Sequence, residues 1–128
     1  MFKYLLILTM IFSSLFSCQK PEGVESVSAE AFAKIIANDT NIVRLDVRTA
    51  EEYAEGHIEG SINIDVLSPD FEQKALAQLS KDKKIALYCR SGNRSKQAMR
   101  ILSNNGYKVV ELNTGVLGWM SARLPLVR

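Results

Sequence analysis

The sequence predicts a three-layer α/β domain, with a mostly parallel, five-stranded sheet covered by helices on both faces. Two observations favour this fold class. Short apolar segments typical of buried strands alternate along the chain with segments of helical periodicity. No internal repeat or low-complexity tract interrupts that alternation. Strands separated by helices usually pair in parallel, because the chain crosses the sheet between them.

Apolar runs mark the expected strands, and cap signals mark the expected helices. Ser28 can cap the first helix through its hydroxyl, and Thr49 with Glu52 forms a capping box for the second. Pro69 fits the first turn of the third helix, and Gly106 can end the fourth. In chain order, the strands are predicted at residues 24–27, 42–47, 61–64, 85–88 and 107–112. The helices are predicted from 28 to about 37, from 50, from 68 to about 79, over 93–104 and over 116–120.

The N-terminal segment is expected to direct export rather than to fold with the domain. Residues 1–3 carry one positive charge and residues 4–16 are almost wholly apolar, a run shorter than the ~20 residues of a membrane-spanning helix. The run ends at Ser17-Cys18, which resembles a bacterial lipobox. We therefore predict a signal peptide over 1–17, lipidation of Cys18, a tether over 18–23 and one folded domain over 24–128. This places the domain in the cell envelope on a lipid anchor; the alternative is an ordinary cleaved signal and a soluble periplasmic protein.

Composition excludes several classes of function. A net charge of +2 argues against a dedicated nucleic-acid binder. Two cysteines cannot build a disulfide framework, and a single histidine without a CxxC pair excludes the usual zinc sites. We expect no metal and no organic cofactor.

The most informative stretch lies around Cys89. The apolar strand ends at this cysteine, a turn containing Gly92 follows, and a helix begins at Asn93. Ligands of open α/β sheets bind at the carboxyl ends of strands, and amides of such a loop favour an anion. The amides, the helix dipole, Arg90 and Arg94 should stabilise a Cys89 thiolate.

Charge around this stretch points to an anionic ligand. Seven basic residues and no acidic one lie between Asp82 and Glu111. The pattern is that of a site that attracts a small anion and activates a sulfur nucleophile. The alternative is an inert core cysteine beside basic residues that only solvate a helix.

Three separated stretches resemble the rhodanese family, in the family's order and over essentially the whole mature domain. The first runs from Leu45-Asp46-Val47-Arg48 through Glu52-Tyr53 to residues 56–64. The second is Cys89-Arg90-Ser91-Gly92-Asn93-Arg94-Ser95, which looks like the active-site loop. The third covers 112–119 and Leu124-Pro125-Leu126. Thr114 and Arg123 depart from the pattern, since each stands where the family usually has glycine.

The resemblance implies a sulfurtransferase that works by double displacement. Cys89 would take a sulfane sulfur from a small anionic donor such as thiosulfate and hand it as a persulfide to a thiol, cyanide or protein acceptor. Substrate-binding roles are implied for Arg90, Ser91, Gly92, Asn93, Arg94 and Ser95. Asp46 and Arg48 would form an ion pair or hold the loop, His57 would fix a loop by hydrogen bonding, and Trp119 would pack in the core. The protein is expected to be a monomer.

Two alternatives remain open. A persulfide carrier with little turnover of its own needs the same loop as an enzyme. The same fold also hosts Cdc25-type phosphatases and arsenate reductases, but their loops are one residue longer. Here four residues separate Cys89 from Arg94, which favours sulfur over a tetrahedral oxyanion.

Overall fold

The computed structural model describes residues 23–128. The predictions of a signal peptide over 1–17 and of lipidation at Cys18 fall outside these residues, as does nearly all of the tether. Within the described residues, no helix is both long and apolar enough to cross a membrane.

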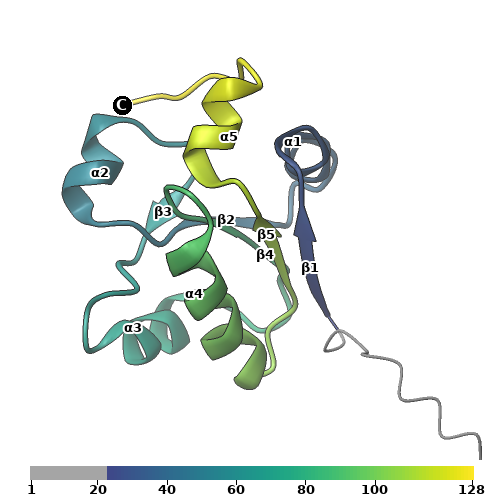
Figure 1. Ribbon diagram of the computed structural model, residues 1–128. Coiled ribbons are helices and arrows are strands. Elements are labelled where there is room, and N and C mark those ends of the chain that lie inside the picture. The colour runs from purple at the N-terminus through teal and green to yellow at the C-terminus, as the bar shows by residue number, and fades with distance from the viewer. Residues whose placement is uncertain (1–22) are drawn as a thin grey trace, which may run out of the picture.

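One five-stranded sheet organises the domain, and all of its described pairings are parallel. The strand order is β1-β5-β4-β2-β3, so the central strand β4 lies between β5 and β2 (Figure 1). The strands are β1 (Val24–Val27), β2 (Val43–Asp46), β3 (Ile62–Asn63), β4 (Ile85–Tyr88) and β5 (Val109–Leu112). The predicted α/β class is confirmed.

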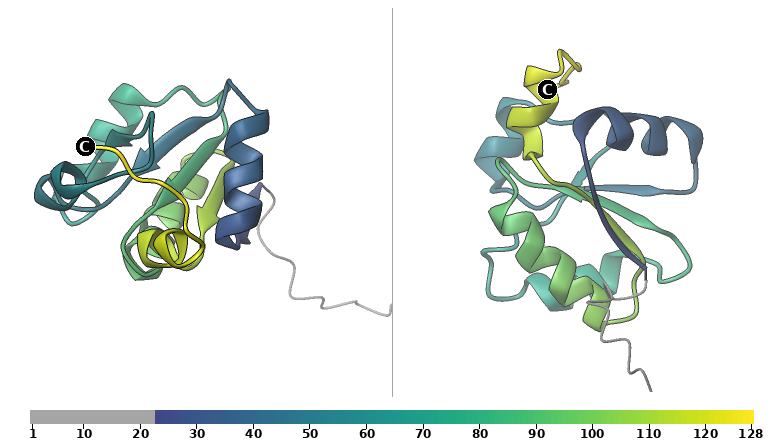
Figure 2. Two further views of the ribbon diagram at one scale, coloured as in Figure 1. Left: turned by 90° about the horizontal axis from the view of Figure 1, so that it is seen from above. Right: turned by 45° about the vertical axis from the view of Figure 1, so that its right-hand side comes forward.

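Helices cover both faces of the sheet (Figures 1 and 2). One layer contains α1 and α5, which contact each other, and the opposite layer contains α3 and α4, which do the same. Helix α2 buries no residue and lies on the β3 side of the molecule (Figure 1). The helices are α1 (Ala29–Asn38), α2 (Ala50–Glu55), α3 (Phe71–Gln78), α4 (Asn93–Asn104) and α5 (Gly115–Ser121).

The sheet separates two hydrophobic cores, and β4 contributes to both. Its side chains alternate: Ile85 and Leu87 face the α3–α4 layer, whereas Ala86 and Tyr88 face the α1–α5 layer. Every residue of β4 is buried, as expected for the central strand of a parallel sheet. Cys89 continues the alternation into the α3–α4 core.

The cap signals at Ser28, at Thr49 with Glu52 and at Gly106 are confirmed, whereas Pro69 lies in the turn before the third helix rather than in its first turn. The starts of α3 and β5 also need correction. Helix α3 begins at Phe71 rather than Ser68, because the Phe71 amide donates to the Ser68 carbonyl in a tight turn that precedes the helix. Strand β5 begins at Val109 rather than Tyr107, because the Tyr107 amide donates to the Leu102 carbonyl at the end of α4. Gly106 (φ +87°) makes that ending possible.

Candidate functional site

The Cys89 loop connects β4 to α4 at the carboxyl edge of the sheet. Gly92 is the N-cap of α4 and has φ +106°, a left-handed value that favours glycine. A Cβ at this position would lie 2.2 Å from the Asn113 carbonyl oxygen. The tight turn therefore needs glycine at position 92 for two reasons. The backbone is left-handed there, and the segment after β5 leaves no room for a Cβ.

The first residues of α5 hold the backbone of this loop. The Val116 amide donates to the Cys89 carbonyl at 2.9 Å, and the Leu117 amide donates to the Arg90 carbonyl at 3.1 Å. Gly115 has φ +62°, and a Cβ there would lie 2.3 Å from the Arg90 carbonyl oxygen. The C-terminal stretch is thus part of the scaffold of the site.

The two departures from the family pattern are accommodated locally. Thr114 precedes α5, and its side chain lies against Gly118, where a Cβ would come within 1.8 Å of the Thr114 hydroxyl. Arg123 has φ +60°, a left-handed conformation that residues with a Cβ adopt at some energetic cost. With Thr114 as its N-cap, α5 begins at Gly115.

Cys89 lies at the base of the loop, and only 1% of the residue is exposed. The Gly92 amide donates to its Sγ at 3.1 Å, and the Ser95 Oγ lies 3.4 Å from it. Burial raises the pKa of the thiol, but the hydrogen bond with the Ser95 hydroxyl and those from the Ser95, Gly92 and Ser91 amides together outweigh it and lower the pKa. Main-chain donors therefore converge on the sulfur and favour its thiolate.

A buried carboxylate lies behind Cys89, and sequence reasoning missed it. Glu111 is fully buried on β5. The Ser95 hydroxyl donates to its Oε2, and the Ser26 hydroxyl donates to its Oε1 at 2.7 Å. Lys96 Nζ lies 3.3 Å from both carboxylate oxygens. The signal that could have found it is an acidic residue inside an otherwise apolar strand.

Arg94, predicted to bind the donor, is engaged by a second carboxylate. Its two Nη atoms donate to the two carboxylate oxygens of Glu52 at 2.6 and 2.8 Å. These bonds, aided by Thr49 and opposed by burial, lower the pKa of Glu52 to about 2. Glu52 therefore bonds both to Thr49 in the capping box of α2 and to Arg94 on α4, and the local sequence pattern indicates only the first of these partners.

Asp46 and Arg48 form the expected ion pair. Arg48 Nη2 lies 2.6 Å from Asp46 Oδ2 and also donates to the Gly56 carbonyl at 2.7 Å. Both residues are buried, and the Arg48 guanidinium lies 5.8 Å from the centre of the Tyr88 ring. The pair makes no described contact with Cys89. The pair stabilises the turn between β2 and α2, and Arg48 also lines a cavity beside the Cys89 loop.

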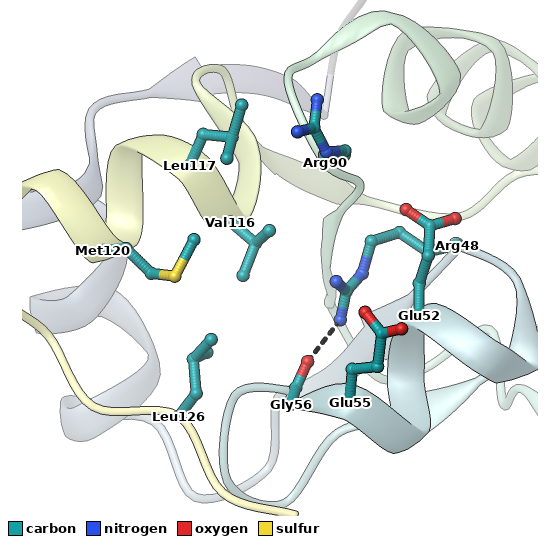
Figure 3. Close-up of a pocket in the computed structure, with 9 residues that line it drawn as sticks. All are labelled: Arg48, Glu52, Glu55, Gly56, Arg90, Val116, Leu117, Met120 and Leu126. Atoms are coloured by element: carbon teal, nitrogen blue, oxygen red, sulfur yellow. Dashed lines mark hydrogen bonds between the residues drawn. The ribbon is translucent and has the colours of Figure 1, made fainter.

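A cavity of about 270 Å³ lies in front of the loop (Figure 3). One wall is apolar and comes from α5 and the C-terminal segment, with Val116, Leu117, Met120 and Leu126. The opposite wall carries charged groups. Its lining residues there are Arg48, Glu52, Glu55, Gly56 and Arg90. Cys89 itself does not line the cavity, although its neighbour Arg90 does.

The remaining predicted residues take the following positions. Arg90, Ser91 and Asn93 are exposed on the loop and at the start of α4. His57 Nδ1 lies 2.9 Å from the Tyr53 carbonyl oxygen, which agrees with a loop-fixing role. Trp119 is buried against Phe32, as expected for core packing.

Comparison with known proteins agrees with this architecture. The family model described as a rhodanese-like domain matches residues 28–122. A sulfurtransferase of Allochromatium vinosum is 31% identical over 106 residues, which cover 81% of this chain and 95% of that protein. A candidate sulfur carrier protein of Bacillus subtilis, YrkF, is 32% identical over 80% of this chain and 55% of its own length. A rhodanese-related protein of Thermoplasma volcanium, known from its crystal structure, has a TM-score of 0.70 and 32% identity over 80% of this chain and 97% of that one.

The family match spans both sides of the site, from the cap of α1 to the end of α5, and so includes the Cys89 loop and the α5 segment that holds it. The relatives named above are 31–32% identical over about four fifths of this chain. The chain belongs to the rhodanese-like domain family.

Proposed function

We propose that this protein is a sulfurtransferase that carries a sulfane sulfur as a persulfide on Cys89. The observation that carries the proposal is the set of hydrogen-bond donors around Sγ, above all the Gly92 amide at 3.1 Å. These donors lower the pKa of the thiol despite its burial. They would also stabilise negative charge on a terminal sulfur bonded to Sγ.

The first half-reaction loads the cysteine. The Cys89 thiolate attacks the outer sulfur of a thiosulfate-like donor, and a new S–S bond forms at Sγ. The S–S bond of the donor breaks, and sulfite leaves with its electron pair. No external oxidant is needed, because the sulfane sulfur is already at the oxidation level of the persulfide.

The second half-reaction unloads it. A thiolate or cyanide acceptor attacks the terminal sulfur of the persulfide, and the Cys89 thiolate leaves. The Gly92 amide and the other loop donors then stabilise the thiolate as they do in the resting protein. The chain's own contribution is to hold one sulfur anion in a fixed place through both steps.

Access to Sγ favours a small donor. Because only 1% of Cys89 is exposed, a bulky substrate cannot reach Sγ without movement of the loop. Arg90 lines the cavity beside the loop and has no ion-pair partner among the described residues. It is placed to attract an anion. Arg94 can do so only after it exchanges Glu52 for the donor.

A persulfide carrier is the second candidate function. The similarity to the candidate sulfur carrier of B. subtilis favours it, as does the burial of Cys89, which would protect a loaded sulfur from solvent. Enzyme and carrier differ in turnover rather than in the geometry of the resting site.

A phosphatase-like or arsenate-reducing activity is less well supported. A tetrahedral oxyanion needs a wide ring of donors and a free arginine. The loop holds four residues between Cys89 and Arg94, and Arg94 is paired with Glu52. Aryl phosphatase activity lost in Cys89→Ser would support this alternative.

Export and lipid anchoring are also part of the proposal. They rest on the apolar run over 4–16 and on Cys18, which would become the lipidated N-terminus. The domain would then act in the cell envelope. The mass of the mature N-terminus tests this directly, since lipid on Cys18 adds acyl chains and a plain signal does not.

The test of the main proposal combines mass spectrometry with a steady-state assay. Thiosulfate should increase the intact mass by one sulfur atom, peptide mapping should place that sulfur on Cys89 rather than Cys18, and Cys89→Ser should abolish both loading and transfer to cyanide. Stoichiometric loading without turnover would identify a carrier. Full activity in Cys89→Ser would exclude Cys89 as the nucleophile.

A further inference from the structure

The cavity beside the Cys89 loop has an apolar wall that transfer from thiosulfate does not need, because a small inorganic donor has no apolar part to contact it. The wall consists of Val116, Leu117, Met120 and Leu126 (Figure 3). Leu117 and Met120 are two of the five large hydrophobic residues that are exposed in the described part of the chain, at 36% and 48%. Covering such surface with the apolar part of a ligand is favourable.

The apolar wall is fixed to the loop that carries the sulfur. The Val116 amide donates to the Cys89 carbonyl at 2.9 Å, and the Leu117 amide donates to the Arg90 carbonyl at 3.1 Å. A molecule that lies against the wall is therefore held next to the loop. The atom that it has to reach is the loaded sulfur, which lies one S–S bond of about 2 Å beyond the covered Sγ.

The opposite wall offers two charges that are free to meet a ligand. Of its four charged residues, Arg48 and Glu52 already have ion-pair partners. Arg90 and Glu55 have none within residues 23–128, and Figure 3 shows them at opposite ends of this wall. Arg90 can attract the thiolate of an acceptor, and Glu55 then disfavours a carboxylate at the other end of the same molecule.

The size of the cavity favours a small ligand. Its volume of about 270 Å³ is below the roughly 300–1,000 Å³ of pockets that bind drug-sized molecules. Because only 1% of Cys89 is exposed, the surface of a folded protein cannot contact Sγ without movement of the loop. A short-chain molecule therefore fits this site better than a protein acceptor does.

We propose that this cavity is the acceptor site and that the acceptor is a small thiol with an apolar chain and no carboxylate. Its thiolate attacks the outer sulfur of the Cys89 persulfide, and a new S–S bond forms on the acceptor. The S–S bond to Sγ breaks, and its electron pair stays on Cys89. The products are an alkyl persulfide and the Cys89 thiolate, so no oxidant or reductant is needed. This inference rests on the Cys89 persulfide proposed above and adds the chemical class of the acceptor.

The test follows the loss of the loaded sulfur from the protein. Wild-type protein is loaded with thiosulfate, separated from the donor and mixed with ethanethiol, propanethiol or butanethiol, and its intact mass is recorded over time. The three thiols have the same reactive group, so differences in rate report the contribution of the chain. We expect the second-order rate constant to increase about threefold for each added methylene group, and about tenfold from ethanethiol to butanethiol. Equal rates would overturn the proposal.

Two exposed apolar residues provide a matched pair of variants. Met120→Ser removes part of the apolar wall and should reduce the butanethiol-to-ethanethiol ratio from about tenfold to about threefold. Leu67 is 60% exposed and does not line the cavity, so Leu67→Ser should leave the ratio unchanged. Each ratio compares two thiols on one protein, and a general loss of activity therefore cancels. An unchanged ratio in Met120→Ser would contradict the role of the apolar wall.

The charged wall is tested with 3-mercaptopropionate, which has a carboxylate where propanethiol has a methyl group. After correction for the thiolate fraction of each reagent, the acid should react about threefold more slowly, and Glu55→Gln should narrow this difference about twofold. A carboxylated thiol that reacts as fast as propanethiol would refute the proposed selection against carboxylates.

Failure of this inference is distinguishable from failure of the proposed function. Protein that takes no sulfur from thiosulfate has no persulfide to offer, and both proposals are then wrong. Protein that loads on Cys89 but reacts with the three alkanethiols at one rate remains a sulfurtransferase, and only the alkyl thiol acceptor is then wrong.

Discussion

The Cys89 loop is held differently on its two sides. On the inner side, main-chain groups of α5 bond to the carbonyls of Cys89 and Arg90, and the buried Glu111 bonds to Ser95. On the outer side, the attachment is an ion pair of two partly exposed side chains, Arg94 and Glu52. Backbone contacts in a packed interior have few alternatives, whereas a partly exposed ion pair exchanges its partners with water and anions.

The difference separates two tasks that one loop must perform. Sulfur transfer requires the Sγ and its amide donors to stay in fixed relative positions, because preorganised donors stabilise charge without further rearrangement. Binding and release of an anionic donor require charges that can change partner. The inner side serves the first task and the outer side the second.

The largest expected effect comes from breaking the inner side at Gly115. Its φ of +62° and the 2.3 Å approach of a Cβ to the Arg90 carbonyl oxygen make Gly115→Ala strained and sterically blocked. We expect a loss of about 3 kcal/mol or more in the free energy of unfolding. Gly106→Ala is the matched control, because Gly106 has φ +87° but no atom within 4 Å of a Cβ.

Denaturant unfolding of the two glycine variants separates strain from close approach. Gly106→Ala should lose only about 1 kcal/mol, the penalty of the left-handed conformation alone. Equal losses in the two variants would mean that the α5 segment yields to the added methyl group, and the inner side would then be less rigid than its contacts indicate.

The second effect compares the two carboxylate–arginine pairs near the loop. Asp46→Asn leaves the buried Arg48 guanidinium without its charged partner, and such a loss costs about 3 kcal/mol. Glu52→Gln weakens the partly exposed pair with Arg94, which should cost about 1 kcal/mol or less. Unfolding in urea measures both, and a reversed order would contradict the assignment of Asp46 and Arg48 to the scaffold.

The sequence could predict the local features of this site but not its long-range partners. The capping box of Thr49 and Glu52, the turn at Gly92 and the strand ending at Cys89 are encoded by neighbouring residues, and the structure contains all three. The Arg94–Glu52 pair joins residues 42 positions apart. Such a pair depends on how α2 and α4 are placed around the sheet, which periodicity and cap signals do not specify.

The same reasoning explains why Glu111 was missed. Its strand, β5, lies between β1 and β4, and only this strand order places Ser26 and Ser95 around its carboxylate. A single acidic residue in an apolar segment does not reveal that order. The fold class follows from the alternation of strands and helices, whereas strand order decides which side chains meet.

A third prediction concerns the donor rather than stability. Arg94→Ala should raise the KM for thiosulfate about tenfold, through the loss of a charge-assisted hydrogen bond to the donor. Glu52→Gln should lower the KM about twofold, because Arg94 no longer has to leave a carboxylate. Both values come from steady-state transfer to cyanide. An unchanged KM in Arg94→Ala would assign this arginine to structure alone and leave Arg90 as the anion-binding group.

The smallest effect is a pH dependence of stability that Glu52 should contribute. Its pKa is about 2 in the folded protein, below the ordinary glutamate value of 4.5, so the folded state binds this proton less readily than the unfolded state does. The contribution of Glu52 is therefore complete above about pH 4.5 and is lost as the pH falls from there towards 2. Acid unfolding of Glu52→Gln should show a shallower loss of stability in that window than wild type, and the two curves should run parallel at neutral pH. Identical slopes below pH 4.5 would mean that Arg94 and Glu52 are already apart in solution, in which case the outer side of the loop is open before any anion arrives.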